Sequence, residues 1–209
     1  MIAIIDYGMG NSASILNMIQ RVGGEGVITS DRQDLLNASA IILPGVGAFD
    51  NAINKLRSLE LIDILQKRLV IDKVPFLGIC LGMQLLFESS EEGTEAGLGI
   101  LPGQVKRFSG SPFSSGKLKI PHMGWNLIAP TRAEHSLFQD LSSEPRFYFT
   151  HSYYVECGME YVSATCDYGG PFTCAIQKES MHAVQFHPEK SHKFGMQLFR
   201  NFLNQLSPC

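Results

Sequence analysis

The chain has 209 residues, of which 44% are hydrophobic and 18% are charged, and its formal net charge is −3. A chain of this length and composition can bury a sizeable core, which excludes an intrinsically disordered protein. The slightly acidic balance also excludes a nucleic-acid-binding protein that depends on a broad basic face. We expect a single domain over residues 1–209.

The N-terminal segment and the cysteines indicate a cytoplasmic protein. Residues 1–6 have no basic region and end in an acidic side chain, unlike a secretory signal. The most apolar stretch without charges, residues 74–87, contains Pro and Gly and is shorter than the ~18 residues of a membrane span. The five cysteines are odd in number and form no C-x-x-C pair, which disfavours a disulfide framework and a zinc site. We therefore expect no membrane and no metal.

The first half of the chain alternates short apolar runs with helical patterns. The apolar runs predict strands over residues 2–5, 27–29, 41–43 and 76–79. Helices are predicted between them, over residues 15–22, from Asp50 to Leu65 as one long helix, and over 83–87. Alternation of this kind predicts parallel strands joined by right-handed crossovers, with helices on both faces of the sheet.

The second half has shorter strand patterns that are separated by Gly, Pro and Ser. They cover residues 104–108, 147–155, 161–165 and 183–186 and predict antiparallel strands and long loops added to the sheet. A last helix begins at His192 and carries one apolar stripe. The predicted fold is therefore α/β, with a mostly parallel central sheet, helices on both faces and an added antiparallel strand region.

The turn after the first predicted strand allows a nucleotide-binding interpretation. Gly8, Gly10 and Ala13 match G-x-G-x-x-A at the start of a helix, and Asp31 follows the second strand, as in dinucleotide-binding units. The same glycines suit an ordinary tight turn, in which they supply positive φ. A dinucleotide-binding module is therefore a distant alternative, because stronger chemistry lies further along the chain.

Cys80 lies in a pattern typical of a nucleophile elbow, Gly78-Ile79-Cys80-Leu81-Gly82. The sharp turn requires small residues two positions on either side, and it places the sulfur at a helix N-terminus that stabilises a thiolate. The Leu81 N–H then points to where an oxyanion forms. A buried structural cysteine is the alternative, but glycines on both sides of a strand-to-helix joint favour catalysis.

A nucleophilic cysteine needs a base and a group that orients the base. His187 follows an apolar strand, and residues i and i+2 of an extended segment share a face, so Glu189 can hold the imidazole in one tautomer. We interpret His122 and His151 as hydrogen-bonded loop histidines. The sequence therefore predicts Cys80, His187 and Glu189 as a catalytic triad.

The segment Pro44-Gly45-Val46-Gly47 ends the third predicted strand. It lies close to the elbow if the third and fourth strands pair in parallel. Glycine-flanked backbone can present N–H groups to an anion. The segment is therefore a candidate second oxyanion donor, and a plain strand-ending turn is the alternative.

Residues 44–47, 78–84 and 186–189 together resemble the class I (triad) glutamine amidotransferases. Three further segments, residues 6–11, 121–126 and 148–153, are similar to one subfamily, the glutaminase subunits of imidazole glycerol phosphate synthases. The run Pro-His-Met-Gly-Trp-Asn at 121–126 is the most specific of these segments. The resemblance spans nearly the full chain and implies the flavodoxin-like α/β fold of the class.

The resemblance implies hydrolysis of L-glutamine to glutamate and ammonia without a metal or an organic cofactor. Cys80 is implied to attack the side-chain amide, while His187 acts as base and then acid and Glu189 orients it. Three residues are implied to hold the α-amino and carboxylate groups of the substrate: Gln84, Ser152 and Tyr153. The implied oxyanion hole consists of the Leu81 N–H and the Val46–Gly47 peptide, which becomes available only when the partner is loaded.

The resemblance also implies a heterodimer with a (β/α)8-barrel cyclase subunit of histidine biosynthesis, which receives the ammonia. Four positions match those that the family uses near this interface: Met123, Trp125, Tyr148 and Lys190. A lone Trp beside an exposed Met suits a binding hot spot, and a core Trp is the alternative. No nucleic-acid partner and no membrane are implied.

Residues 192–195, His-Lys-Phe-Gly, depart from the usual subunit of the histidine pathway. They are more similar to paralogues that supply ammonia to sugar amidotransferases of surface-polysaccharide synthesis. A glutaminase of that kind is the main alternative, with the same chemistry and a different ammonia acceptor.

Overall fold

Five neighbouring strands of the central sheet run parallel, in the order β2-β1-β3-β4-β12. The computed structural model in which they lie describes residues 1–131 and 136–206. Four of these strands come from the apolar runs of the first half of the chain, and the fifth comes from near its end. Their bounds are β1 (Ile2–Ile5), β2 (Gly26–Thr29), β3 (Ala40–Leu43), β4 (Phe76–Ile79) and β12 (Met181–Val184).

Beyond β12 the sheet continues with antiparallel strands in the order β11-β10-β7-β8. These strands are β7 (His122–Pro130), β8 (Arg146–His151), β10 (Val162–Asp167) and β11 (Pro171–Lys178). A side branch consists of β5 (Ser89–Ser90), β6 (Gln104–Arg107) and β9 (Tyr153–Glu156), and β9 joins it to β11. The predicted antiparallel region added to a parallel sheet is therefore confirmed.

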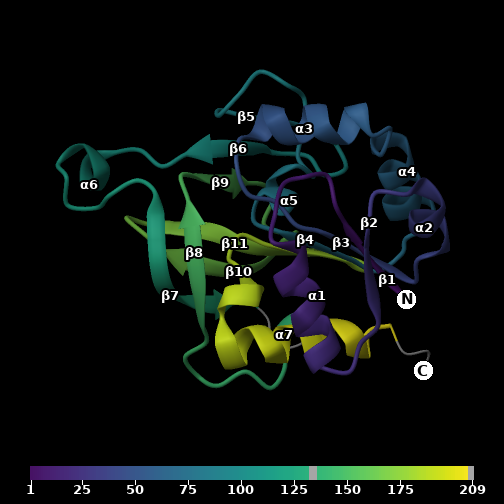
Figure 1. Cartoon of the computed structure of the whole chain (residues 1–209). Coiled ribbons are helices and arrows are strands. Elements are labelled where there is room, and N and C mark those ends of the chain that lie inside the picture. Colours follow the sequence, from purple (N-terminus) through teal and green to yellow (C-terminus); the bar gives the residue numbers. More distant parts are fainter. Residues whose placement is uncertain (132–135, 207–209) are drawn as a thin grey trace.

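Helices cover both faces of the parallel strands (Figure 1). Two of them, α1 (Ser12–Arg21) and α7 (His192–Asn204), lie together on one face, while α2 (Arg32–Asn37), α3 (Phe49–Ser58) and α4 (Ile62–Gln66) lie on the other. Shorter elements are the π-turn Lys67–Ile71, α5 (Leu81–Gln84), α6 (Ser111–Ser114), and the 3₁₀ turns Ser136–Phe138 and Pro188–Lys190. In the described part of the chain, none of the helices could cross a bilayer.

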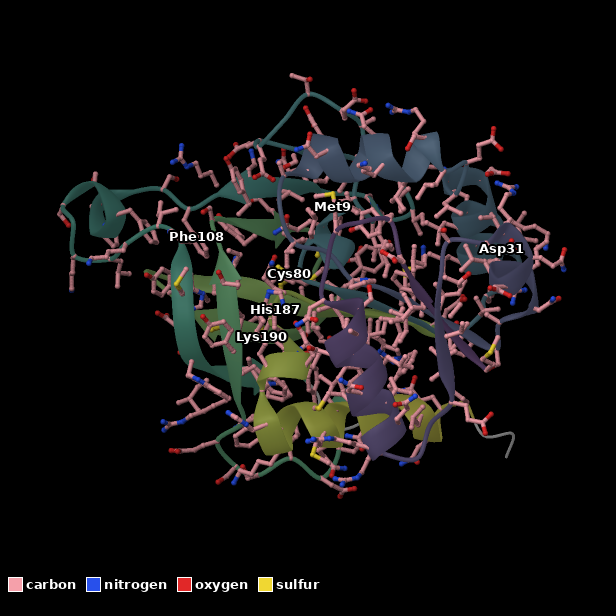
Figure 2. The ribbon with its side chains drawn as sticks, in the orientation of Figure 1. Met9, Asp31, Cys80, Phe108, His187 and Lys190 are labelled. Atoms are coloured by element: carbon pink, nitrogen blue, oxygen red, sulfur yellow. The ribbon has the colours of Figure 1, made fainter. Side chains whose placement is uncertain are left out.

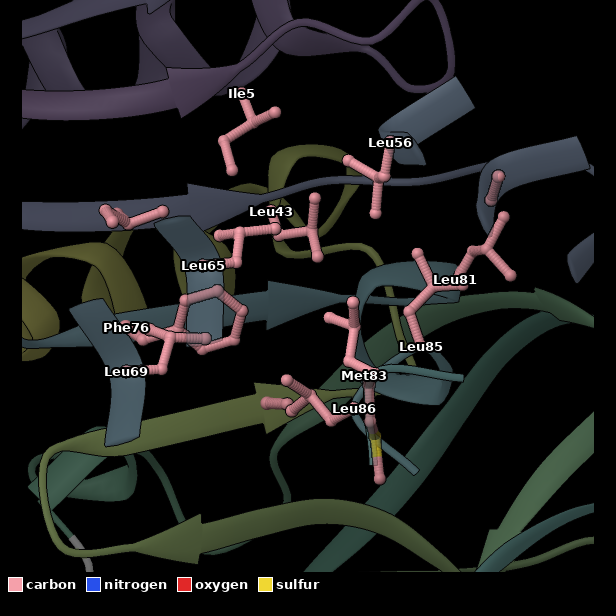
Figure 3. Packing of buried hydrophobic residues seen from close by; sticks show 14 of the residues in the cluster. Ile5, Leu43, Leu56, Leu65, Leu69, Phe76, Leu81, Met83, Leu85 and Leu86 are labelled. Carbon is pink, nitrogen blue, oxygen red and sulfur yellow. The ribbon is translucent and has the colours of Figure 1, made fainter. Parts of the chain in front are cut away.

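The core has two layers because successive side chains of a strand point to opposite faces. In β1, Ala3 and Ile5 pack on the side of α3 and α4, whereas Ile2 and Ile4 pack on the side of α1 and α7. Figure 3 shows the first layer, in which Phe76 of β4 lies among the aliphatic side chains of neighbouring elements. Burial on both faces explains why β1, β3 and β4 appear in the sequence as continuous apolar runs.

The predicted long helix over residues 50–65 is wrong, because the chain leaves the helix between α3 and α4. Glu60 adopts φ 55°. Its N–H bonds to the carbonyl of Arg57 at 3.0 Å, and the Leu61 N–H bonds to the carbonyl of Leu56 at 2.9 Å. This is the Schellman pattern, in which glycine usually takes the left-handed position. Because Glu takes it here, the sequence contains no signal for the end of the helix.

Two other predicted elements are wrong in extent. The helix predicted over 83–87 is the short α5, which begins at Leu81 and ends at Gln84, and the apolar residues that follow form buried turns. The strand predicted over 147–155 is interrupted at Ser152, because β8 pairs with β7 while β9 pairs with β6 and β11. This interruption leaves Ser152 outside both strands, beside the cavity described below.

Candidate active site

The carboxyl ends of three adjacent parallel strands, β3, β4 and β12, meet at one edge of the sheet. The register pairs Leu43 with Gly78 and Ile79 with Val184, so the segments that follow these strands are neighbours. Open α/β sheets bind ligands at this edge. Cys80 follows β4 directly, and Figure 2 shows it next to His187, which comes after β12.

Cys80 lies at a sharp strand-to-helix turn and has the strained backbone angles φ 55° and ψ −107°. Its N–H extends the ladder of β4 by donating to the carbonyl of Val184 at 2.7 Å. A Cβ on Gly82 would overlap the carbonyl oxygen of Leu43, and one on Gly78 would lie 2.8 Å from the carbonyl oxygen of Gly82. The glycines of the predicted elbow are therefore required by close backbone contacts.

His187 and Glu189 form a buried pair, with 2.9 Å between His187 Nδ1 and Glu189 Oε1 and both side chains 2% exposed. The local geometry differs from the one predicted. The strand β12 ends at Val184, and Glu189 lies in the 3₁₀ turn Pro188–Lys190, so the turn rather than an extended segment brings the two side chains together.

The charges around His187 favour its protonated form. Burial lowers the pKa of His187, but the neighbouring Cys80 and Glu189 outweigh burial and raise that pKa to about 10. Glu189 occupies the Nδ1 side of the ring. The other nitrogen, Nε2, is buried and has no hydrogen-bond partner among the described residues, which leaves this atom available to exchange a proton.

A cavity of about 340 Å³ opens beside the sulfur of Cys80. Besides Cys80, its walls include every residue that the sequence predicted for the oxyanion hole and for substrate binding: Val46, Gly47, Leu81, Gln84, Ser152 and Tyr153. These residues come from separate segments, the loops after β3 and β4, α5, and the junction of β8 and β9. The fold therefore brings the predicted residues to one cavity.

Hydrogen bonds within the protein fix the backbone of the loop after β3, which borders the cavity. The Leu81 N–H donates to the carbonyl of Gly45 at 3.3 Å, so it points at the β3 loop. The hydroxyl of Tyr7 donates to the carbonyl of Pro44 at 2.7 Å, and burial raises the pKa of this phenol. Gly47 has φ 113°, a conformation in which a side chain would be strained.

The four predicted interface residues form a group on β7, β8 and the turn after His187. Met123 and Trp125 lie on one side of β7 and are 62% and 47% exposed, which overturns the alternative of a core Trp. The Tyr148 ring packs edge-on against Trp125, with 6.2 Å between centroids, and Lys190 Nζ lies 5.7 Å from the Tyr148 ring. His192 stacks on Trp125 with 5.4 Å between ring centroids.

The prediction that His122 and His151 are loop residues is wrong, because they lie buried on β7 and β8. Their hydrogen bonding is confirmed, since His122 Nδ1 lies 3.0 Å from His151 Nε2. His151 Nδ1 in turn lies 2.7 Å from the carbonyl oxygen of Tyr153 at the cavity. The two rings therefore support the segment that contains Ser152 and Tyr153.

Asp31 lies far from this edge of the sheet, as Figure 2 shows by the positions of Asp31 and Cys80. Its carboxylate caps α2 by accepting from the N–H groups of Gln33 and Asp34 at 2.6 and 3.3 Å. Helix capping therefore explains this acidic residue. The described residues contain no group of three or more His, Cys, Asp or Glu placed to hold a metal ion.

The family model described as "Glutamine amidotransferase class-I" matches residues 3–206. The chain belongs to the class-I glutamine amidotransferases. Solved structures agree with this fold. One structure described as a glutamine amidotransferase has a TM-score of 0.75 at 18% identity and covers 99% of both chains. PurLQS from Thermotoga maritima has a TM-score of 0.74 at 17% identity and covers 99% of this chain and 98% of that chain.

Curated relatives of this amidotransferase are named as subunits of imidazole glycerol phosphate synthase. The subunit HisH 2 of Methanococcus maripaludis is 50% identical over 206 residues, which are 98% of this chain and all of that one. HisH 2 of Pseudomonas aeruginosa is 46% identical over 97% of this chain and 98% of its own. HisH of Acaryochloris marina is 48% identical over 98% of this chain and 94% of its own.

Two residues at the amidotransferase site were missed by the sequence reasoning. Glu92 lines the cavity and accepts the N–H of Phe49 at 2.9 Å, and burial raises the pKa of its carboxyl. Gln185 is fully buried between Gln84 and Cys80. Glu92 lies in a polar, glycine-containing run that has no motif signal. The position of Gln185, two residues before His187, was the only available signal.

Proposed function

We propose that the chain is a single-domain, cytoplasmic glutaminase subunit of an imidazole glycerol phosphate synthase, which hydrolyses L-glutamine to glutamate and ammonia. One observation carries the proposal: the buried His187–Glu189 pair lies beside Cys80 at a strained elbow that opens into a cavity. The curated relatives support the choice of subunit, because this chain covers almost their full length at 44–50% identity.

In the proposed mechanism the Cys80 thiolate attacks the carboxamide carbon of glutamine. A C–S bond forms, and the carbonyl electrons move to the oxygen. His187 Nε2 then protonates the amide nitrogen, the C–N bond breaks, and ammonia leaves. Water attacks the resulting thioester, His187 takes a proton from it, and the C–S bond breaks to release glutamate and restore the thiolate. Glu189 keeps the imidazole oriented throughout, because it holds Nδ1.

The cavity contains groups that match the polar end of glutamine. Gln84 donates both amide hydrogens, to the carbonyl of Tyr153 at 3.1 Å and to Gln185 Oε1 at 3.0 Å, so its own carbonyl oxygen can accept from the α-ammonium. The Glu92 carboxylate offers a second acceptor for that cation. Ser152 and Tyr153 also line the cavity, and we assign to them the binding of the α-carboxylate.

The oxyanion hole is proposed to open only after a change in the β3 loop. The Leu81 N–H donates to the Gly45 carbonyl, and a donor that is already used cannot stabilise an oxyanion. Release of this contact, together with rotation of the Val46–Gly47 peptide, provides two N–H donors. Low glutaminase activity of the isolated chain, and a rise when a loaded partner binds, follow from this arrangement.

The proposed partner is a (β/α)8-barrel cyclase, which binds over Met123, Trp125, Tyr148 and Lys190 and receives the ammonia. Transfer across an interface suits this product, since ammonia released into neutral water is mostly protonated. Tyr148 links the proposed docking face to the catalytic histidine directly, because its carbonyl accepts the N–H of His187 at 2.8 Å.

A second candidate differs only in the ammonia acceptor, a sugar amidotransferase of surface-polysaccharide synthesis. The observation that favours it is His192, which has φ 46° and stacks on the exposed Trp125. This residue begins the segment that departs from the usual subunit, and it modifies the centre of the proposed docking face. A different partner surface would explain the change.

The test is glutamate release from L-glutamine by the purified chain alone, with a histidine-pathway cyclase, and with that cyclase plus its nucleotide-derived substrate. We expect low release in the first two cases and a large rise in the third. No rise with the loaded cyclase, from a chain whose Cys80 still reacts with a glutamine-derived electrophile, would favour the second candidate.

The control for this assay is Cys80→Ala. We expect it to abolish glutamate release and to leave the fold and partner binding intact, because the missing sulfur leaves only a small gap at the cavity wall. Glutamate release by this variant at the wild-type rate would overturn the triad assignment.

A further inference from the structure

Gln185 lies between the proposed substrate-binding and nucleophilic groups. Its side chain is completely buried, and its Nε2 lies 3.5 Å from the sulfur of Cys80. Its Oε1 accepts a hydrogen bond from Gln84 Nε2 at 3.0 Å, and its backbone N–H donates to the carbonyl of Cys174 at 2.9 Å. The amide therefore contacts the reacting atom on one side and a cavity residue on the other.

We propose that Gln185 is a further catalytic residue, whose amide N–H donates to the sulfur of Cys80 and stabilises it as the thiolate. This inference rests on the proposed function, because it concerns the same nucleophile. It adds a neutral donor to the set of groups that act on the sulfur, alongside the imidazolium of His187.

The hydrogen-bond network determines which end of the Gln185 amide faces the sulfur. Gln84 Nε2 can only donate, so the atom of Gln185 that faces it must be the carbonyl oxygen. The orientation of Gln84 is determined in turn by the carbonyl of Tyr153, which can only accept. The remaining end of the Gln185 amide is the NH₂ group, and it is the end that faces Cys80.

The chemical effect of this donor is greatest when the sulfur carries charge. The sulfur is charged before attack and again when the thioester breaks down and the thiolate leaves. Hydrogen bonds to a charged partner stabilise it more than those to a neutral one. Gln185 therefore favours the thiolate in the resting enzyme and assists its departure in the second half of the reaction.

The other groups that face Cys80 can be distinguished from Gln185 by their titration. His187 and Tyr7 both interact electrostatically with the sulfur, and His151 and Glu92 line the same cavity. Gln185 carries no charge at any pH. Replacing it therefore changes the ionisation of Cys80 without removing any of these titratable groups.

The experiment measures the rate at which iodoacetamide alkylates Cys80 as a function of pH, read by mass spectrometry of the peptide that contains Cys80. Two variants of the full chain are compared with wild type. Gln185→Met removes both hydrogen bonds at similar volume. Gln185→Glu keeps an acceptor for Gln84 and replaces the donor with an oxygen. Circular dichroism confirms that each variant is folded.

We expect the midpoint of the alkylation profile to rise by about one pH unit in Gln185→Met, which corresponds to ~1.4 kcal/mol. The rise should be at least as large in Gln185→Glu, where a carboxylate faces the sulfur. In Gln185→Glu, kcat for glutamine should fall while KM stays near wild type, because the contact to Gln84 is retained. Gln197→Glu, a half-buried glutamine on α7, is the matched control and should leave the midpoint unchanged.

A folded variant, either Gln185→Met or Gln185→Glu, that alkylates with the wild-type midpoint would overturn the proposal. If Gln185→Met does not fold, Gln185→Leu, which also removes both hydrogen bonds without adding a charge, is measured in its place. The outcome of this test is independent of the test of the proposed function, because alkylation by iodoacetamide requires neither glutamine nor a partner. A chain that never hydrolyses glutamine would refute the proposed function, while the midpoint still reports the contact between Gln185 and Cys80.

Discussion

The buried histidines beside the cavity form a directed chain of hydrogen bonds. His151 Nδ1 must carry a proton, because it faces the carbonyl of Tyr153, so its Nε2 accepts from His122 Nδ1. His122 Nε2 in turn accepts from Asn126 Nδ2 at 3.3 Å. Both rings are neutral in this arrangement. Burial lowers the pKa of His122 to about 4 and that of His151 to about 3.

These pKa values predict a loss of stability in mild acid. An unfolded histidine takes a proton near pH 6.5, whereas the folded rings stay neutral until about pH 4. The unfolded state therefore binds more protons than the folded state as the pH falls through this window. Each ring lowers the free energy of unfolding by up to about 1.4 kcal/mol per pH unit. His187 does not contribute in this window, because its pKa is raised and its stabilisation is lost only as the pH rises from 6.5 towards 10.

The measurement is the free energy of unfolding in urea at a series of pH values between 7 and 5. We expect His151→Asn to flatten this dependence by about 1 kcal/mol per pH unit. His192→Asn, which replaces an exposed histidine, is the matched control and should keep the wild-type slope. An unchanged slope in His151→Asn would contradict the assignment of a neutral buried ring.

At the residue level, the sequence revealed groups that occur in motifs and missed those that act through tertiary contacts. Cys80, His187 and Glu189 were predicted, and the structure brings them together. Glu92 has no local signal and Gln185 has only its position before His187, because their roles depend on which segments lie beside them. A motif can describe a turn and its nucleophile, but it does not specify the neighbours that folding supplies.

The elbow strictly limits substitution at its glycines. Gly82→Ala should destabilise the protein at or above the upper end of the ~1–3 kcal/mol range for overpacking, because the added Cβ meets the backbone carbonyl of Leu43 in β3. That carbonyl belongs to a central strand and cannot move aside. Urea unfolding at neutral pH measures the loss. A stability equal to wild type would show that the elbow tolerates a larger separation from β3.

The control for the elbow is Gly116→Ala. Gly116 has φ 74° and open space around its Cβ position, so this variant isolates the cost of a left-handed backbone without a clash. We expect it to lose only ~1 kcal/mol.

Elements were predicted where local pattern and burial coincide. Strands β1, β3 and β4 are buried on both faces and appear as apolar runs. The strand β7 was not predicted as a strand because it exposes apolar side chains and buries a polar one. Met123 and Trp125 are exposed on one side, and His122 is buried on the other. Polar residues inside and apolar residues outside are the reverse of a solvated sheet surface, and they favour the docking face proposed above.

At the scale of the whole molecule, the proposed docking face and the catalytic edge are joined by one strand. Tyr148 of β8 packs against Trp125 on the exposed side, while its carbonyl accepts the N–H of His187. Its own N–H donates to the hydroxyl of Ser191 at 3.0 Å, and that hydroxyl donates to the carbonyl of His187 at 2.6 Å. A partner that presses on this face therefore contacts the segment that positions the base.

This arrangement predicts that Trp125→Ala separates partner binding from folding. A half-exposed aromatic at the centre of an apolar face suits a hot spot, so the loss should be at least ~2 kcal/mol, or roughly 30-fold in Kd for the cyclase. Stability of the isolated chain should change little, because the ring contributes little to either core layer. Calorimetric titration with the cyclase measures the first effect and urea unfolding the second. Ile71→Ala changes an exposed apolar residue in the π-turn that follows α4, and it should leave Kd unchanged. Figure 1 shows α4 on the opposite side of the molecule from β7 and β8. Equal Kd values for Trp125→Ala and wild type would place the partner on another face.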